Sequence, residues 1–182
     1  MLKIGKLVAE VPIIQGGMAI RLSTARLAAA VAKEGGIGLI AASGMSFDEL
    51  RTEIRLARKL TGGKGIIGIN AMFAAREFLG LITTAAQEKI DLIVAGAGFS
   101  RDIFAVGRKY GVEVVPIVSS VKLAKISEKL GASAIVVEGT EAGGHLEPSN
   151  LLKRYFRRLL NPLIYLLLLP AALSAAVMLP SF

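Results

Sequence analysis

The sequence predicts an α/β protein with the architecture of a TIM-type (β/α) barrel. Apolar, strand-like runs begin near Pro12, Ile37, Ile66, Asp91, Glu113 and Ala134. The segments between these runs have helical periodicity, so strand and helix alternate along the chain. The runs are apolar throughout instead of alternating, which is typical of parallel strands that are covered on both faces. Units that repeat in this way require a parallel sheet with helices outside it.

Helices are expected between the strands, at residues 23–33, 46–60, 74–88, 101–110 and 121–130. Ser23 is expected to cap the first of them, and Ser46-x-x-Glu49 has the pattern of a capping box. Helix C-caps need left-handed backbone, which glycine adopts without strain. The glycines that follow helices at suitable positions are Gly35, Gly111 and Gly131.

Small or polar residues end nearly every strand, which favours a barrel over a doubly wound sheet. A barrel builds its site from many strand ends, whereas a doubly wound sheet concentrates its site at one switch point. The residues concerned are Gln15 to Gly17, Ser43 and Gly44, Asn70, Gly96 to Gly98, Ser119 and Ser120, and Glu138 to His145. A full barrel has eight strand–helix units, but the pattern stops after six. The sequence therefore predicts an incomplete barrel whose first and sixth strands have unpaired edges.

The chain is divided into a barrel fragment, residues 1–150, and a tail, residues 151–182. The tail begins with a basic group, Lys153, Arg154, Arg157 and Arg158, and residues 161–179 are apolar except at Asn161, Tyr165 and Ser174. We expect an apolar helical tail, interrupted by Pro162 and Pro170. Its length is near the lower limit for a membrane span. A frame-shifted or truncated end is the favoured interpretation, and a membrane-associated or interfacial helix is the alternative.

Composition excludes several classes of function. The 182 residues are 53% hydrophobic and include no cysteine, which rules out disulfides and thiolate metal sites. A single histidine argues against a catalytic zinc site. The basic group of the tail supplies four of the eight net positive charges. The remaining charges are spread along helical faces, so no nucleic-acid partner is expected. The first residues lack the apolar core of a signal peptide, which predicts a cytoplasmic protein.

The stretch ASAIVVEGTEAGGH, residues 132–145, is the most informative in the chain. A buried strand is followed by a turn with Gly143 and Gly144, which allow the backbone to lie close against a flat ligand. His145, the only histidine, is suited to proton transfer near neutral pH. It is the candidate catalytic residue. The alternative is a histidine that caps a helix or binds a carbonyl group.

Two further strand ends are candidates for ligand binding. The backbone amides of Gln15 to Ala19 could approach a flavin ring and stabilise its reduced form, although a tight turn alone would also need these glycines. Asn70 ends an apolar strand with a carboxamide that both donates and accepts hydrogen bonds. An Asx turn is the alternative explanation for Asn70.

Three motifs in this order resemble one flavoenzyme superfamily. The motifs PIIQGGMA (12–19), GIIGINAMFA (65–74) and IVVEGTEAGGH (135–145) are similar to motifs of the FMN-dependent nitronate monooxygenases, or 2-nitropropane dioxygenases, and of the FMN-dependent enoyl-acyl-carrier-protein (enoyl-ACP) reductases. The resemblance covers roughly residues 1–147 and then stops. It implies a barrel fold and FMN as cofactor. The residues that it places at the cofactor are Gly17, Met18, Ala19, Asn70, Lys122, Glu138, Gly143 and Gly144.

The function expected from this resemblance is FMN-dependent oxidation of alkyl nitronates with O₂, with His145 positioning or deprotonating the substrate. One alternative is NADH-dependent reduction of an enoyl thioester. A second is a non-catalytic, truncated barrel remnant, which folds poorly, aggregates, or survives by pairing with another copy. A third is a binding protein anchored to a membrane by its tail. The choice of substrate, the tail and the oligomeric state are left open by the sequence.

Overall fold

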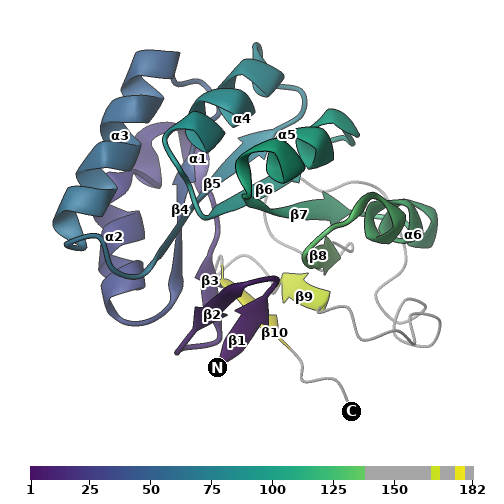
Figure 1. Cartoon of the computed structure of the whole chain (residues 1–182), viewed down its shortest axis with the longest axis horizontal. Helices are drawn as coiled ribbons and strands as arrows, with labels where there is room; N and C mark the ends of the chain where they lie inside the picture. The colour runs from purple at the N-terminus through teal and green to yellow at the C-terminus, as the bar shows by residue number, and fades with distance from the viewer. Residues whose placement is uncertain (138–164, 169–174, 179–182) are drawn as a thin grey trace.

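The computed structural model describes residues 1–137, 165–168 and 175–178. Within them, six parallel strands follow one another in chain order and curl into a barrel-shaped sheet with helices outside (Figure 1). The strands are β3 (Ile13–Gln15), β4 (Ile37–Ala41), β5 (Ile66–Met72), β6 (Leu92–Gly96), β7 (Glu113–Val118) and β8 (Ile135–Val137). Each begins at, or next to, the position that the sequence predicts. The predicted incomplete (β/α) barrel, with six parallel strands and helices outside the sheet, is therefore confirmed.

Two short strands from the tail lie between the first and last of these six. β9 (Tyr165–Leu168) pairs in parallel with β8, and β10 (Ala175–Met178) pairs antiparallel with both β9 and β3, so the sheet closes into a ring. The expectation of unpaired edges on the first and sixth strands is wrong, and these eight residues are strands where a helix was expected. Exposed edge strands offer free N–H and C=O groups. The apolar segments on either side of Pro170 satisfy them, and a proline also disfavours a continuous helix there.

In the described part of the chain, no helix combines the length and the apolar character that crossing a membrane requires.

An amino-terminal hairpin, which the sequence analysis did not predict, closes the barrel where its strands begin. β1 (Leu2–Ile4) and β2 (Leu7–Ala9) pair antiparallel, with Leu2 opposite Ala9. Leu2 and Ile4 are fully buried among side chains of the barrel interior. The Lys6 N–H donates a hydrogen bond to the carboxylate of Glu113, the first residue of β7 (3.1 Å). This end of the barrel is thereby filled by side chains, so the opposite rim is the one where a site can form.

The described helices agree closely with the sequence prediction, except that the short α1 was not predicted and α4 begins later than expected. They are α1 (Ala19–Leu22), α2 (Ala25–Lys33), α3 (Phe47–Leu60), α4 (Phe78–Gln87), α5 (Asp102–Tyr110) and α6 (Val121–Leu130). Gly111 and Gly131 end α5 and α6 in left-handed conformation, as predicted. The N-cap of α2 is Thr24 and not Ser23, whose hydroxyl binds elsewhere. Ser46 caps α3 by accepting from the Glu49 N–H (3.2 Å).

Core side chains form two layers that follow the alternation along each strand. Ile37 and Leu39 of β4 pack inside the barrel, together with the hairpin. Ile40 of the same strand packs between the sheet and the helices. The strand residues are therefore apolar on both faces, which explains why the sequence shows continuous runs instead of alternation.

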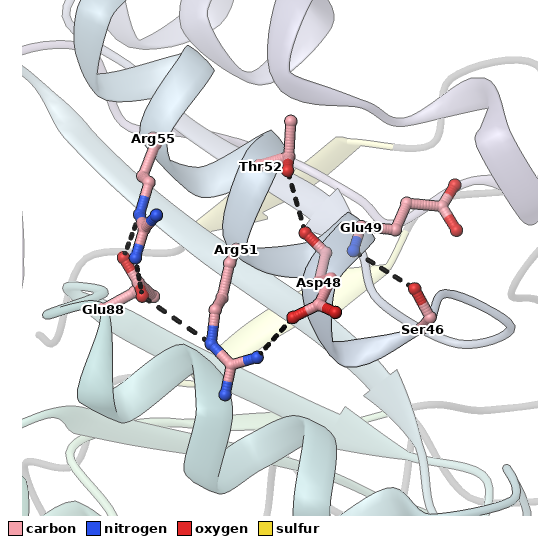
Figure 2. A network of polar contacts seen from close by, with 7 residues as sticks. All are labelled: Ser46, Asp48, Glu49, Arg51, Thr52, Arg55 and Glu88. Carbon is pink, nitrogen blue, oxygen red and sulfur yellow. Dashed lines mark hydrogen bonds and ion pairs between the residues drawn. The ribbon is translucent and has the colours of Figure 1, made fainter.

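Ion pairs join α3 to the end of α4 on the outside of the barrel (Figure 2). Arg55 binds both carboxylate oxygens of Glu88 (2.8 and 2.7 Å), and Arg51 lies between Glu88 (3.8 Å) and Asp48 (2.8 Å). The hydrogen-bonded guanidinium of Arg55 lowers the pKa of Glu88 and, in return, the pKa of Arg55 is raised. These contacts connect two neighbouring helices on the surface.

Candidate functional site

The turn that follows β3 is held by a buried glutamine. Gln15 is only 7% exposed, and its carboxamide points toward the helix side of the sheet. Its Oε1 accepts from the Leu39 N–H of β4 (3.1 Å), while its Nε2 donates to the Gly16 carbonyl and to the Ser23 hydroxyl (3.0 Å). All the hydrogen-bonding capacity of this side chain except one carbonyl lone pair is thereby used. Gln15 thus connects the turn to the neighbouring strand.

Ser23 completes this network from the other end of the turn. Its side chain is fully buried and accepts the Met18 N–H (2.8 Å) while it donates to the Gly16 carbonyl (3.2 Å). The Met18 amide, which the resemblance places at the cofactor, is therefore already paired within the protein. Ser23 was expected to cap a helix, but its hydroxyl serves the turn because α2 starts only at Ala25.

Gly17 lies in this turn and faces a residue two strands away. A β-carbon built on Gly17 would fall 2.4 Å from the Asn70 Cβ and 2.7 Å from its Cγ. Real Cβ atoms do not approach so closely, so only glycine fits at position 17 in this arrangement. The structure thus brings together two of the predicted cofactor residues, Gly17 and Asn70, at the rim where the barrel strands end.

The Asn70 side chain is half-buried beside Gly17, in the last part of β5. Its backbone carbonyl accepts from the Ala42 N–H (2.8 Å). Its carboxamide has no hydrogen-bond partner among the described residues. A half-buried amide without a protein partner is costly unless water or a ligand satisfies it. This arrangement fits a flat ring with alternating donors and acceptors, such as the isoalloxazine of FMN.

An aromatic side chain, which the sequence analysis did not single out, lies just beyond Asn70. Phe73 is 45% exposed and packs edge-to-face on Phe78, with ring centroids 5.5 Å apart. A β-carbon on Gly98 would fall 2.5 Å from the Phe73 Cδ1, so the loop after β6 runs directly against this ring. The glycine in GAGFS thus serves close packing against an aromatic ring. The run MFA after Asn70 was the sequence feature that could have indicated it.

An ion pair ties the far end of the turn to α3. Arg21 binds the Glu49 carboxylate through two nitrogens (2.9 and 3.1 Å), and its backbone is left-handed, with φ of 60°. The hydrogen bond from Arg21 lowers the pKa of Glu49, and the same contact raises the pKa of Arg21. The Ser46 backbone N–H also lowers the pKa of the Glu49 carboxyl, so Glu49 serves both the predicted capping box and the ion pair with Arg21.

The remaining predicted site residues follow the turn directly, lie at the start of α6, or lie outside the described residues. Lys122 is exposed in the first turn of α6, and Ala19 is the first residue of α1. Glu138, Gly143, Gly144 and His145 lie outside the described residues. Their placement at the cofactor stays a prediction.

A cleft of about 710 Å³ lies elsewhere, among the amino-terminal ends of the strands. Glu10, Lys33, Glu34 and Lys64 line it, together with the glycines next to β4 and β5. Two lysines and two glutamates give this cleft no net charge preference. It is remote from Gly17 and Asn70 in the fold, so it is distinct from the candidate site.

Comparison with known proteins places this geometry in a family context. The chain is 30% identical over 137 residues to a (3aS,4S,5R,7aS)-5-hydroxy-7a-methyl-1-oxo-octahydro-1H-indene-4-carboxyl-CoA dehydrogenase of Rhodococcus jostii, covering 75% of this chain and 38% of that protein. It is 28% identical to a probable nitronate monooxygenase of Staphylococcus aureus, covering 79% of this chain and 51% of the relative.

Solved structures agree with the fold. FabK from Thermotoga maritima is 34% identical with a TM-score of 0.73, and the match covers 78% of this chain and 45% of FabK. A nitroalkane oxidase from Streptomyces ansochromogenes, at 24% identity and a TM-score of 0.67, shares the fold. The chain thus spans about half, or less, of the length of these relatives. A family model for nitronate monooxygenase matches residues 1–88 and 63–162, and the chain belongs to the nitronate monooxygenase family.

Proposed function

We propose that this chain provides part of the site of an FMN-dependent oxidoreductase, and that the barrel rim around Gly17 and Asn70 holds the flavin ring. The observation that carries the proposal is the contact between the Gly17 backbone and the half-buried Asn70 side chain. Family membership supports it, because the glycine turn and Asn70 stand in the motifs that resemble the family's flavin-binding motifs. FMN, when bound, supplies the redox chemistry, which no side chain of this chain provides.

The residues of the chain bind and orient the ring in this proposal. Gly17 allows close approach of backbone, and the Asn70 carboxamide donates to and accepts from the ring edge. The double glycine at Gly143 and Gly144 and the polar Glu138 belong to the same site by resemblance, as do Ala19 and Lys122. His145 holds or accepts the proton that the substrate loses, since imidazole titrates near neutral pH.

The finer proposal is oxidation of alkyl nitronates with O₂. It is supported by the match of the family model to residues 1–88 and 63–162 and by the similarity to a probable nitronate monooxygenase. Enoyl-thioester reduction with NADH is the second candidate. It is supported by the 30% identity to a dehydrogenase whose name specifies a CoA thioester.

Reconstitution of the full chain with FMN tests both the proposed flavin binding and the choice of substrate. Protein saturated with FMN should carry about one flavin per chain after gel filtration, with a visible spectrum shifted from that of free FMN. Oxygen consumption with an alkyl nitronate, compared with NADH oxidation with an enoyl thioester, then separates the two substrates. Protein that never retains FMN would contradict the proposal and would favour the non-catalytic remnant.

A further inference from the structure

The hydroxyl of Ser23 has no hydrogen-bonding capacity left for any ligand. It accepts from Met18 N–H (2.8 Å) and Gln15 Nε2 (3.0 Å), and it donates to the Gly16 carbonyl (3.2 Å). A serine hydroxyl has one proton and two lone pairs, so all three are used. Because Ser23 is also fully buried, its side chain acts only on its protein neighbours.

Ser23 is itself fixed to the sheet through its backbone. Its carbonyl accepts from the N–H of Ala41, the last residue of β4 (2.8 Å), and its N–H donates to the Met18 carbonyl (3.2 Å). Gln15 is bound to the same strand through Leu39 (3.1 Å). Both ends of the turn are therefore anchored to β4, the parallel neighbour of β3 in the sheet.

Gly17 differs from its neighbours in the turn. The Met18 N–H is paired with Ser23, and the Gly16 carbonyl accepts from both Gln15 and Ser23. Among the described residues, the Gly17 N–H has no hydrogen-bond partner, and the Gly17 backbone lies against Asn70. The network thus uses the groups on either side of Gly17 and leaves its N–H unpaired among the described residues, in a turn whose backbone lies against Asn70.

We infer that Ser23 and Gln15 are positioning residues, which hold the Gly16–Met18 turn in one conformation and present the Gly17 N–H to the flavin. The inference rests on the proposed function. Neither side chain touches the ring, and both act through the backbone. A donor that is already oriented before binding loses no free energy to ordering when the ligand arrives. An N–H held at the ring also favours the more negative, reduced flavin over the oxidised one.

The first experiment compares Ser23→Ala with Ser127→Ala in the full chain. Ser127 is an equally buried serine, whose hydroxyl donates to the Leu123 carbonyl in α6 (2.8 Å), so it controls for the loss of a buried hydroxyl. In FMN-free protein, amide exchange followed by NMR should be at least tenfold faster at Met18 in Ser23→Ala and unchanged at Met18 in Ser127→Ala. Fast Met18 exchange in the wild type would overturn the inference without any reference to flavin.

The second measurement is flavin binding. Ser23→Ala should bind oxidised FMN about tenfold more weakly than the wild type, and reduced FMN more weakly still, so its flavin potential should fall. Ser127→Ala should leave both the affinity and the potential at the wild-type values. A wild type that does not bind FMN sinks the proposed function and this inference together. A Ser23→Ala variant with wild-type affinity and potential sinks the inference alone.

A double-mutant cycle with Gln15→Met tests whether the two side chains act as one unit. Gln15→Met keeps the side-chain length but removes the contacts to Ser23, Gly16 and Leu39. If the two residues form one clamp, the double variant should bind FMN only about as weakly as the weaker single variant. Fully multiplicative effects would show that each acts independently, and would overturn the clamp.

Discussion

The backbone of Gly17 lies against the side chain of Asn70, so closely that a β-carbon on Gly17 would fall 2.4 Å from the Asn70 Cβ. Gly17 lies in the turn that follows β3, and Asn70 lies in β5, which is separated from β3 by β4 in the sheet. Their contact therefore spans the barrel rim and does not follow a hydrogen-bonded strand pair. It makes the size of residue 17 and the size of residue 70 interdependent.

This contact predicts how Gly17→Ala depends on residue 70. In the wild-type background the added methyl should destabilise the fold by about 1–3 kcal/mol, as overpacking does. The cost should persist in Asn70→Ala, which keeps the Cβ, and should largely disappear in Asn70→Gly, which removes it. Urea unfolding with and without Gly17→Ala, in the wild-type, Asn70→Ala and Asn70→Gly backgrounds, measures the cost of the added methyl in each. Equal costs in all three would contradict the contact.

Asn70→Ala should weaken FMN binding by roughly 1–3 kcal/mol, because a ring group that was paired with the carboxamide loses its partner. Quenching of FMN fluorescence on titration gives the affinity. Thr83→Ala is the control, since its hydroxyl donates to the Leu79 carbonyl within α4 (2.8 Å) and not to a residue of the turn or of β5. Unchanged affinity in Asn70→Ala would place this residue outside the site.

His145→Ala should leave FMN binding nearly intact and lower turnover by about 10²- to 10⁴-fold, the range for loss of an acid–base group. The measurement is steady-state turnover of FMN-loaded protein with the substrate that the wild type accepts. Full turnover in His145→Ala would rule out the catalytic role proposed for this histidine.

The ion pair between Arg55 and Glu88 should make a pH-dependent contribution to stability. Arg55 lowers the pKa of this carboxyl in the folded state, so its stabilising effect is full above the pKa of the unfolded chain and is lost as the pH falls through the folded pKa. Glu88→Gln should therefore lower the Tm near neutral pH, by no more than about 3 °C for a partly exposed pair. The difference from wild type should vanish in acid, below the ordinary glutamate range.

Thermal unfolding at several pH values measures that difference. Glu77→Gln is the control, since the Glu77 side chain is exposed and has no ion pair among the described residues. A Tm difference for Glu88→Gln that is the same at every pH would show that the ion pair with Arg55 is not its cause.

Ring closure by β10 predicts the effect of a proline at Ala176. This residue lies opposite Ile14 of β3 and Leu168 of β9, so a proline removes a donor that one of these strands uses. Ala176→Pro should destabilise the protein by on the order of 3 kcal/mol and increase association, because two strand edges become accessible. Light scattering after gel filtration detects association. Ala176→Val retains the N–H and should stay close to wild type; equal behaviour of both variants would argue against closure by β10.

The sequence was sufficient for the six parallel strands because each is a continuous apolar run with a glycine or polar residue at its end. It was not sufficient for β10, since an antiparallel partner for β3 depends on a contact between distant residues, and no local pattern reports it. The hairpin was missed because Leu2 and Ile4 lie in strands too short to show a period. Gly17 and Asn70 were predicted as site residues, but their mutual contact required coordinates. Ser23 is a residue type that often caps helices. Its hydroxyl binds the turn instead because α2 starts only at Ala25.

The pairing of β10 with β3 sets the order in which this chain can fold during synthesis. Neighbouring parallel strands from β3 to β8 are joined by short helical connections, so they can assemble as soon as each helix has been made. β3 must wait for residues 175–178, which reach the solvent last among the described strands. Until then, its outer edge is open to other chains. The nascent protein should therefore be most prone to misassociation in the interval between the completion of β8 and the arrival of β10.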